Sequence, residues 1–237
     1  MKIIAIANQK GGVSKTTTAL NLGAGLHRKK KKILLVDLDT QGDLSATLKT
    51  TAEGGKNLLD VARGKAQMKE LIHKTESGLD LIPSCLDLVK LERQIITLDF
   101  SGLDYDFVLI DCPPNMAGNA VAAIRASDGV LVPTTADLYA VRSVKAVMES
   151  VESLDRKVIG IVLTRFNERF NISTQVLTAL ESLAENFGTK LFKTYIHEGV
   201  AVRESQLMNS NVFEYDSSSV PAQDYLKLAA EIIKERF

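Results

Sequence analysis

Apolar residues follow two spacings that alternate along the chain. Six short runs rich in Ile, Val and Leu lie at residues 2–7, 32–37, 79–83, 106–111, 129–133 and 158–164. Continuous apolar runs of this length are typical of strands that are buried on both faces, as in parallel sheets. The pattern therefore predicts a mostly parallel sheet with both faces covered.

Longer segments between these runs place apolar residues three and four positions apart, which is the spacing of amphipathic helices. We expect helices at residues 17–29, 86–98, 138–154, 172–187 and 222–237. Pro221 is expected to open the last one, whose apolar face is predicted to hold Leu226, Ala229, Ile233 and Phe237. Helices alternating with strands predict an α/β fold, with residues 1–237 forming a single doubly wound domain with helices on both faces of the sheet.

Composition narrows the function classes. The chain has 29 basic and 29 acidic residues, so no overall field attracts nucleic acid or anionic lipid, and either partner would need a local patch. Cys85 and Cys112 lie far apart without CxxC spacing, which argues against a disulfide framework and a zinc site. The N-terminal apolar run is too short for a signal peptide, and no run is long enough to span a membrane. We expect a soluble cytoplasmic protein.

The segment NQKGGVSKTT, residues 8–17, links the first predicted strand to the first predicted helix. Backbone amides of such a loop can surround phosphate oxygens, Lys15 can neutralise the β- and γ-phosphates, and Thr16 can ligate Mg²⁺. Gln9 and Ser14 depart from the pattern G-x-x-x-x-G-K-[ST]. If Ser14 requires a positive φ, its side chain costs roughly 1–2 kcal/mol. The predicted ATP-binding residues are Lys10, Gly11, Gly12, Val13, Ser14, Lys15, Thr16 and Thr17.

KGGVSKTT resembles the deviant Walker A motif, K-G-G-x-x-K-[ST], of the ParA/MinD family of ATPases. VDLDTQGDLSATL, DFVLIDCPP and GVLVPTTADLYAVRSV resemble later segments of that family, in the family's order. Residues 163–180 and 212–233 resemble its chromosome and plasmid partition branch. The resemblance implies a P-loop ATPase fold with ATP and Mg²⁺ as cofactors.

The resemblance also implies roles for single residues. Lys10 matches the lysine that reaches the partner's phosphates in an ATP-bound sandwich dimer, where a second cation would stabilise charge on the γ-phosphoryl group. Asp39 matches the switch carboxylate that positions the attacking water. The metal residues implied are Thr16, Asp37, Asp39 and Asp111, with the carboxylates ordering the Mg²⁺ shell through water. Lys10, Lys15 and Asp39 are the predicted catalytic residues.

The sequence departs from the family pattern in the switch segments. Thr40 stands where the family has a proline, which is expected to loosen the loop that carries Asp39. After Pro114, the family's asparagine falls on Ala122. These departures concern the coupling between the switch and a partner protein, and not nucleotide binding.

Three functions are compatible with this ATPase pattern. The first is DNA partition at the nucleoid: ATP-bound homodimers bind DNA without sequence preference, and a ParB-like adaptor stimulates hydrolysis. A basic face built from Arg165, Arg169 and Arg203 would support it, although Glu198 and Ala201 replace positive charge that partition relatives carry.

The other two functions change the cargo or the chemistry. A MinD-like ATPase would position itself on a membrane or a protein, but we expect the amphipathic terminal helix to pack on the sheet instead. A redox relative similar to the nitrogenase iron protein would hold an iron–sulfur cluster through cysteines. Cys112 has no convincing partner ligand in Cys85, so the sequence favours partition.

Overall fold

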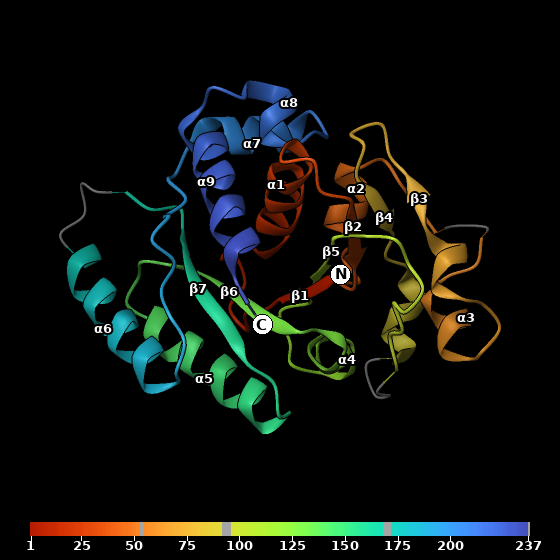
Figure 1. The fold of residues 1–237 in the computed structure, drawn as a ribbon, viewed down its shortest axis with the longest axis horizontal. Helices are drawn as coiled ribbons and strands as arrows, with labels where there is room; N and C mark the ends of the chain where they lie inside the picture. The colour runs from red at the N-terminus through yellow and green to blue at the C-terminus, as the bar shows by residue number, and fades with distance from the viewer. Residues whose placement is uncertain (53–54, 92–95, 168–171, 237) are drawn as a thin grey trace.

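A seven-stranded sheet forms the centre of the computed structural model, which describes residues 1–52, 55–91, 96–167 and 172–236 (Figure 1). The strand order is β3-β4-β2-β5-β1-β6-β7, and every pairing is parallel except β3 with β4. The strands are β1 (Lys2–Ile6), β2 (Ile33–Asp37), β3 (His73–Lys74), β4 (Asp80–Ile82), β5 (Phe107–Asp111), β6 (Gly129–Thr135) and β7 (Val158–Thr164). The predicted mostly parallel α/β sheet is confirmed.

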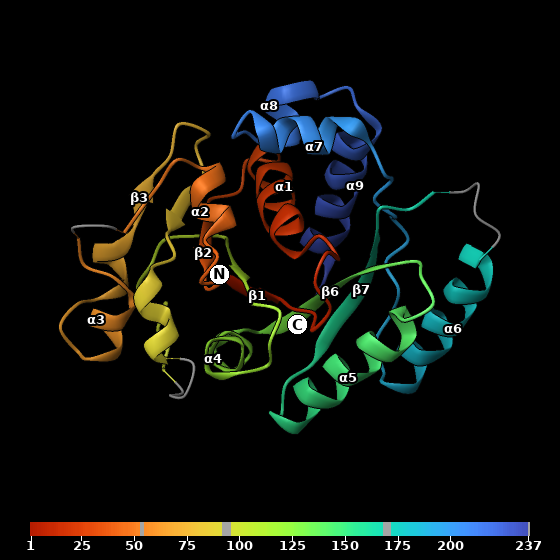
Figure 2. The ribbon, with the colours of Figure 1, turned by 180° about the vertical axis from the view of Figure 1, so that it is seen from behind.

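Helices cover both faces of the sheet, as Figure 1 and the reverse view in Figure 2 show. Ile4 and Ile6 of β1 belong to the apolar cluster under α1 and α9, whereas Ala5 and Ala7 belong to the cluster on the opposite face. This alternation follows from the two-residue period of a strand. One face carries α1 (Lys15–Arg28), α2 (Asp43–Thr47), α8 (Val212–Asp216) and α9 (Val220–Lys234), with α7 (Val200–Leu207) beside them, and the other carries α4 (Gly118–Ala126), α5 (Ala140–Ser153) and α6 (Ile172–Asn186).

Some predicted elements differ from the structure. Within the described residues, the helix expected at residues 86–98 is a 3₁₀ helix over Leu86–Leu91, in which Leu86 and Val89 are 80% and 55% exposed. Residues 92–95 of that prediction lie outside the described residues. The helices α2, α4, α7 and α8 were not predicted, nor were α3 (Leu58–Ala62) and a 3₁₀ helix over Met68–Leu71. The edge strand β3 has only two residues and therefore no apolar run to reveal it.

The predicted apolar face of the last helix is wrong by part of a turn. Pro221 lies in the first turn of α9, as expected. The fully buried face holds Tyr225, Leu228 and Ile232 together with the predicted Ala229, whereas Leu226 and Ile233 pack at its margins. Phe237 lies outside the described residues. The buried face of α9 lies against α1, where Ala229 Cβ lies 3.4 Å from the position a Cβ on Gly25 would take.

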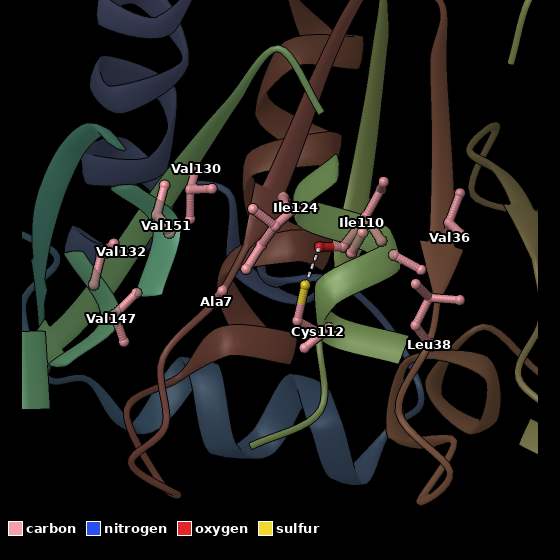
Figure 3. Close-up of a cluster of buried hydrophobic side chains, with 14 of the residues drawn as sticks. Ala7, Val36, Leu38, Ile110, Cys112, Ile124, Val130, Val132, Val147 and Val151 are labelled. Carbon is pink, nitrogen blue, oxygen red and sulfur yellow. Dashed lines mark hydrogen bonds between the residues drawn. The ribbon is translucent and has the colours of Figure 1, made fainter. Parts of the chain in front are cut away.

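Cys112 lies in the apolar cluster on the α4 and α5 face (Figure 3). Its thiol donates a hydrogen bond to the Ile110 carbonyl at 3.7 Å. Burial raises the pKa of the Cys112 thiol far above its usual range, and burial also raises the pKa of the half-buried Cys85. Because metal clusters bind thiolates, this environment does not favour an iron–sulfur centre.

The close approach of β7 to the segment before α7 requires a glycine at position 160. A Cβ on Gly160 would lie 2.5 Å from the Phe192 ring and 3.2 Å from the Lys190 carbonyl. We expect Gly160→Ala to lower the free energy of unfolding by about 1–3 kcal/mol through overpacking, measured by urea denaturation. Gly55→Ala is the control because its Cβ would meet only Ala52 O, at 3.9 Å. Equal stability of the two variants would contradict this assignment.

Candidate functional site

The loop between β1 and α1 is open to solvent where its two glycines lie. A Cβ on Gly11 or Gly12 would meet no atom within 4 Å, and Gly12 has φ 74°. Asn8 anchors the loop from below, because its Nδ2 donates to Pro133 O at 2.8 Å and its Oδ1 accepts from the Lys10 amide at 3.0 Å. The loop therefore presents backbone to the amino end of α1, where backbone amides and the helix dipole favour an anion.

Ser14 takes the left-handed backbone conformation that the sequence left open. Its φ and ψ are 64° and 34°, and it caps α1 without a hydrogen bond from its side chain to the helix. The hydroxyl group therefore gives no capping bond to offset the strain of a left-handed serine. This is the position that holds glycine in the strict motif.

We expect Ser14→Gly to raise the free energy of unfolding by about 0.5–1 kcal/mol. Relief of roughly 1–2 kcal/mol of backbone strain exceeds the added chain entropy of glycine, about 0.5–1 kcal/mol. Ser14→Ala is the matched control, because it keeps the strain and loses no capping bond. Urea denaturation of both variants without nucleotide measures the difference. A Ser14→Gly variant no more stable than Ser14→Ala would show that position 14 is not strained.

Lys15 begins α1 and is buried beneath the loop. Its Nζ donates to Lys10 O at 3.4 Å. Burial lowers the pKa of Lys15, and the nearby Asp111 carboxylate offsets part of that change. Beside it, Thr17 Oγ1 accepts from Gln206 Nε2 at 3.0 Å, and Val13 O accepts from Thr164 Oγ1 at 3.2 Å. The start of α1 is thus fixed to both α7 and β7.

Two carboxylates meet at the carboxyl edge of the sheet, because Asp37 and Asp111 are paired in the β2–β5 register. Asp111 is buried and makes no hydrogen bond of normal geometry in the described residues, although the Thr16 hydroxyl lies close to it. Burial raises the pKa of Asp111 well above its usual value, and the Asp37 charge adds to that rise, whereas the nearby Thr16 hydroxyl opposes it. A bound cation would compensate a buried carboxylate, so Asp111 suits Mg²⁺.

The metal would need ligands besides the protein. No group of three or more His, Cys, Asp or Glu side chains able to hold a metal ion occurs in the part of the chain that the structure describes. This fits Mg²⁺, which is commonly bound by one or two carboxylates, water and substrate phosphates. Thr16, half-buried at the start of α1, lies close to the Asp111 carboxylate.

Asp37 is fully buried and bonded to the loop that follows β2. Its Oδ2 accepts from the amide and the hydroxyl of Ser45 at 2.9 and 2.6 Å, and its Oδ1 accepts from the Asp39 amide at 3.2 Å. Burial raises the pKa of Asp37 to about 6, although the hydrogen bonds from Ser45 oppose that rise. In this structure Asp37 therefore orders the segment that carries Asp39.

Most of the predicted site residues share one cleft of about 720 Å³, a volume typical of nucleotide-sized pockets. Asp39 lies at its edge, half-buried, with its Oδ1 accepting from the Gln41 amide at 3.0 Å. Val13, Asp37 and Asp111 lie beneath the cleft rather than in its wall. The predicted residues that line it are Gly11, Gly12, Ser14, Lys15, Thr16, Thr17, Asp39, Arg165 and Arg203.

Lys10 does not line the cleft. Its Nζ forms an ion pair with Asp137, which follows β6 and also accepts from Thr135 Oγ1 at 2.5 Å. Burial alone would raise the pKa of Asp137, but the hydrogen bonds from Lys10 and Thr135 hold it below its usual value. Sequence reasoning missed Asp137, since no motif spacing links it to a lysine 127 positions away.

Two of the arginines predicted to contact DNA lie beside the acidic residue Glu198. Arg165 and Arg203 both face Glu198 Oε1, with Nη2 atoms at 3.3 and 3.9 Å. Arg169 lies outside the described residues. The first two arginines line the nucleotide-sized cleft, so they do not form a separate basic face in this structure.

The far end of the cleft contains residues that the sequence did not assign to a ligand. Ile196, His197, Val202 and Tyr225 come from the last third of the chain and contribute apolar and ring surface. Asp224 accepts from His197 Nδ1 at 2.7 Å and fixes that ring. Only the fold brings these residues to the loop near the N-terminus, so no local motif could have identified them.

Comparison with known proteins gives matches over the whole chain. A family model described as an AAA domain matches residues 1–164. The chromosome partitioning protein ParA of Caulobacter vibrioides is 35% identical, with 98% of this chain and 94% of the relative covered. The sporulation initiation inhibitor protein Soj of Bacillus subtilis is 33% identical, with 98% of each chain covered.

A solved structure agrees with these relatives. The septum site-determining protein MinD of Pyrococcus horikoshii, complexed with Mg-ADP, superposes with a TM-score of 0.83 at 26% identity, covering 98% of this chain and 96% of that one. The glycine loop, the two strand-end carboxylates and the cleft suit ATP and Mg²⁺, the cofactors that this similarity supports. The chain belongs to the ParA/MinD family of P-loop ATPases.

Proposed function

We propose that this ATPase is a partition protein whose ATP-bound form is a sandwich homodimer that binds DNA without sequence preference. A ParB-like adaptor would stimulate hydrolysis and release the dimer from the nucleoid. One observation carries the proposal: the glycine loop holds two lysines in different places. Lys15 is buried beneath the loop, whereas Lys10 lies outside the cleft wall, where a second molecule could meet it.

Residues in and beneath the cleft would each have a separate role in ATP hydrolysis. Loop amides and Lys15 would hold the phosphates, and Asp39 would orient the attacking water. Thr16 would ligate Mg²⁺ directly, and Asp111 would bind it through water. Asp37, paired with Asp111 at the same edge of the sheet, would help to order the water molecules around the ion. When bound, this ion would neutralise charge on the phosphate oxygens. Slow hydrolysis without a partner is expected, since Lys10 starts in an ion pair with Asp137.

Binding to DNA is supported by the partition relatives and not by net charge. The chain is formally neutral, and Glu198 offsets Arg165 and Arg203. A dimer would double every basic contact, and non-specific affinity rises with the number of phosphates neutralised. ATP-dependent dimerisation would therefore switch DNA binding on.

Molar mass in solution tests the dimer directly. Light scattering at a fixed protein concentration, with Mg²⁺ and either no nucleotide, ADP or ATP, compares the three states of the 25.9 kDa chain. We expect the mass to double with ATP and to remain monomeric in the other two samples. A monomer that binds ATP without any rise in mass would contradict the sandwich dimer.

A second candidate function is MinD-like positioning on a membrane or a protein cargo. The observation that favours it is the structural similarity to MinD. Against it, the apolar face of α9 is buried under α1 and is not free to enter a bilayer. Nor does any helix in the described ranges have the length and apolar content to cross a membrane. ATP-dependent sedimentation with anionic phospholipid vesicles, without DNA binding, would support this second function.

A further inference from the structure

We infer that Ser84 is a positioning residue that holds the switch loop, defined here as residues 39–45, and thereby sets the place of Asp39. Ser84 follows β4, whose partner β2 leads directly into the switch loop. The inference deepens the proposed function and rests on it, because it takes Asp39 as the residue that orients water.

Ser84 contacts the switch loop at both of its ends. Its Oγ donates to the Asp39 carbonyl at 2.5 Å, and its amide donates to Ser45 Oγ at 2.8 Å. Ser45 in turn donates to Asp37 through its hydroxyl and its amide. The loop is therefore closed into a ring of hydrogen bonds that begins and ends on the strands β2 and β4.

Apolar packing holds only the end of the same loop, at Leu44. Asp39 and Ala46 line the nucleotide-sized cleft on one side. On the other side, a second cavity of about 540 Å³ is lined by Thr40, Gln41 and Ser45 of the loop, and also by Ala46, Ser84 and Cys85. Leu44 is fully buried in the apolar cluster under α1, but residues 39–42 line the two cavities and lack the apolar contacts that fix a buried segment. Hydrogen bonds are the main restraint on residues 39–42.

Two residues outside the loop take part in this restraint, Asp37 at the end of β2 and Ser84 after β4. The Asp39 carbonyl also accepts from the Gly42 amide at 3.0 Å, and Asp39 Oδ1 accepts from Gln41. These two bonds shape the loop internally, but neither ties it to the sheet. The Ser84 hydroxyl ties the Asp39 backbone to the end of β4, and buried hydrogen bonds of this kind restrict a chain to one arrangement.

Removing the Ser84 hydroxyl should slow hydrolysis without weakening nucleotide binding. We expect Ser84→Ala to lower kcat about three- to tenfold, the effect of one lost neutral hydrogen bond on an activation barrier. The dissociation constant for ATP should change by less than about twofold, since no phosphate-contacting residue is altered. Ser84→Thr keeps a hydroxyl and should restore kcat. Cys85→Ser changes the residue next to Ser84, which lines the same cavity, and should have the kcat of the wild type.

Amide hydrogen exchange in the nucleotide-free protein supplies a readout that does not depend on activity. Peptides covering residues 39–45 should exchange faster in Ser84→Ala than in the wild type, and at the wild-type rate in Ser84→Thr and Cys85→Ser. If the wild type hydrolyses no ATP, the proposed function is wrong, and the exchange measurement alone still decides whether Ser84 holds the loop.

Several outcomes would overturn the inference. One is wild-type kcat or wild-type exchange in Ser84→Ala. Another is a loss of kcat that Ser84→Thr does not restore. A third is a parallel loss of kcat, ATP affinity and melting temperature, which would show that Ser84 only supports the fold.

Discussion

Replacing Asp39 with alanine is expected to lower the rate of ATP hydrolysis by about 10²–10³-fold, the range for losing a positioned group that orients or polarises the attacking nucleophile. Asp39 lines the same cleft as the glycine loop, and its amide donates to Asp37. The substitution removes the carboxylate but leaves Lys15 and the loop amides unchanged. ATP binding and the ATP-dependent dimer should therefore persist.

Phosphate release at saturating Mg-ATP measures the effect on turnover, and light scattering reports the dimer. Asp43→Ala is the matched control, because Asp43 also lines the cleft but lies on the exposed first turn of α2. It should keep turnover within about threefold of the wild type, as expected for a surface change that removes no positioned group. Persistent hydrolysis in Asp39→Ala would assign the water to another residue. Loss of ATP binding would show that Asp39 acts in affinity instead.

Lys10→Ala is expected to abolish the ATP-dependent dimer while monomeric ATP binding continues. In a two-fold symmetric dimer the substitution removes two charge-assisted contacts, each worth about 1.5–3 kcal/mol, so dimer affinity should fall by about 10²–10⁴. The monomer's cleft loses little, because Lys10 does not line it and Lys15 remains. Titration of ATP followed by light scattering separates the two effects. An unchanged dimer would contradict the role of Lys10.

Asp137→Asn is the companion variant for that experiment. It keeps the size of the side chain and removes the charge that pairs with Lys10 in the monomer. If Lys10 must leave Asp137 to reach a partner's phosphate, the variant should form the ATP-dependent dimer at least as readily as the wild type. A weaker dimer in Asp137→Asn would mean that Asp137 supports the interface itself.

Much of the fold could be predicted because a doubly covered parallel sheet has a strong pattern. The apolar runs at residues 2–7 and 106–111 become β1 and β5 with few changes at their ends. Prediction was wrong where burial overrides local spacing. The segment with the exposed Leu86 and Val89 forms a 3₁₀ helix and not the predicted amphipathic α-helix, and the face of α9 turns toward Tyr225 because α1 supplies its partner surface.

The residues of the candidate site could be predicted where each belongs to a short local motif. The loop from Lys10 to Thr17 and the strand-end carboxylates Asp37 and Asp111 are local patterns, and parallel strands bring those ends to one edge. The ion pair of Lys10 with Asp137 and the contact of Ser84 with the switch loop join distant segments. Such contacts arise from tertiary structure and leave no spacing signal in the chain.

The conformation of Ser14 illustrates a further limit. A serine at the start of a helix can adopt a right-handed or a left-handed backbone conformation, and the sequence does not decide between them. It indicates only that the left-handed conformation carries a strain energy. The structure places it at φ 64°, so the departure from glycine is a strained position and not a harmless substitution.

Binding to a labelled duplex of random sequence tests the central claim most directly. The wild-type protein is measured with ATP, with ADP and without nucleotide, while salt is raised from about 50 to about 200 mM, the range over which multi-phosphate contacts lose affinity steeply. The account predicts binding with ATP only, falling steeply as salt increases. ATP-dependent dimers that bind no DNA at any salt concentration would contradict it and assign the ATP switch to a membrane or protein cargo.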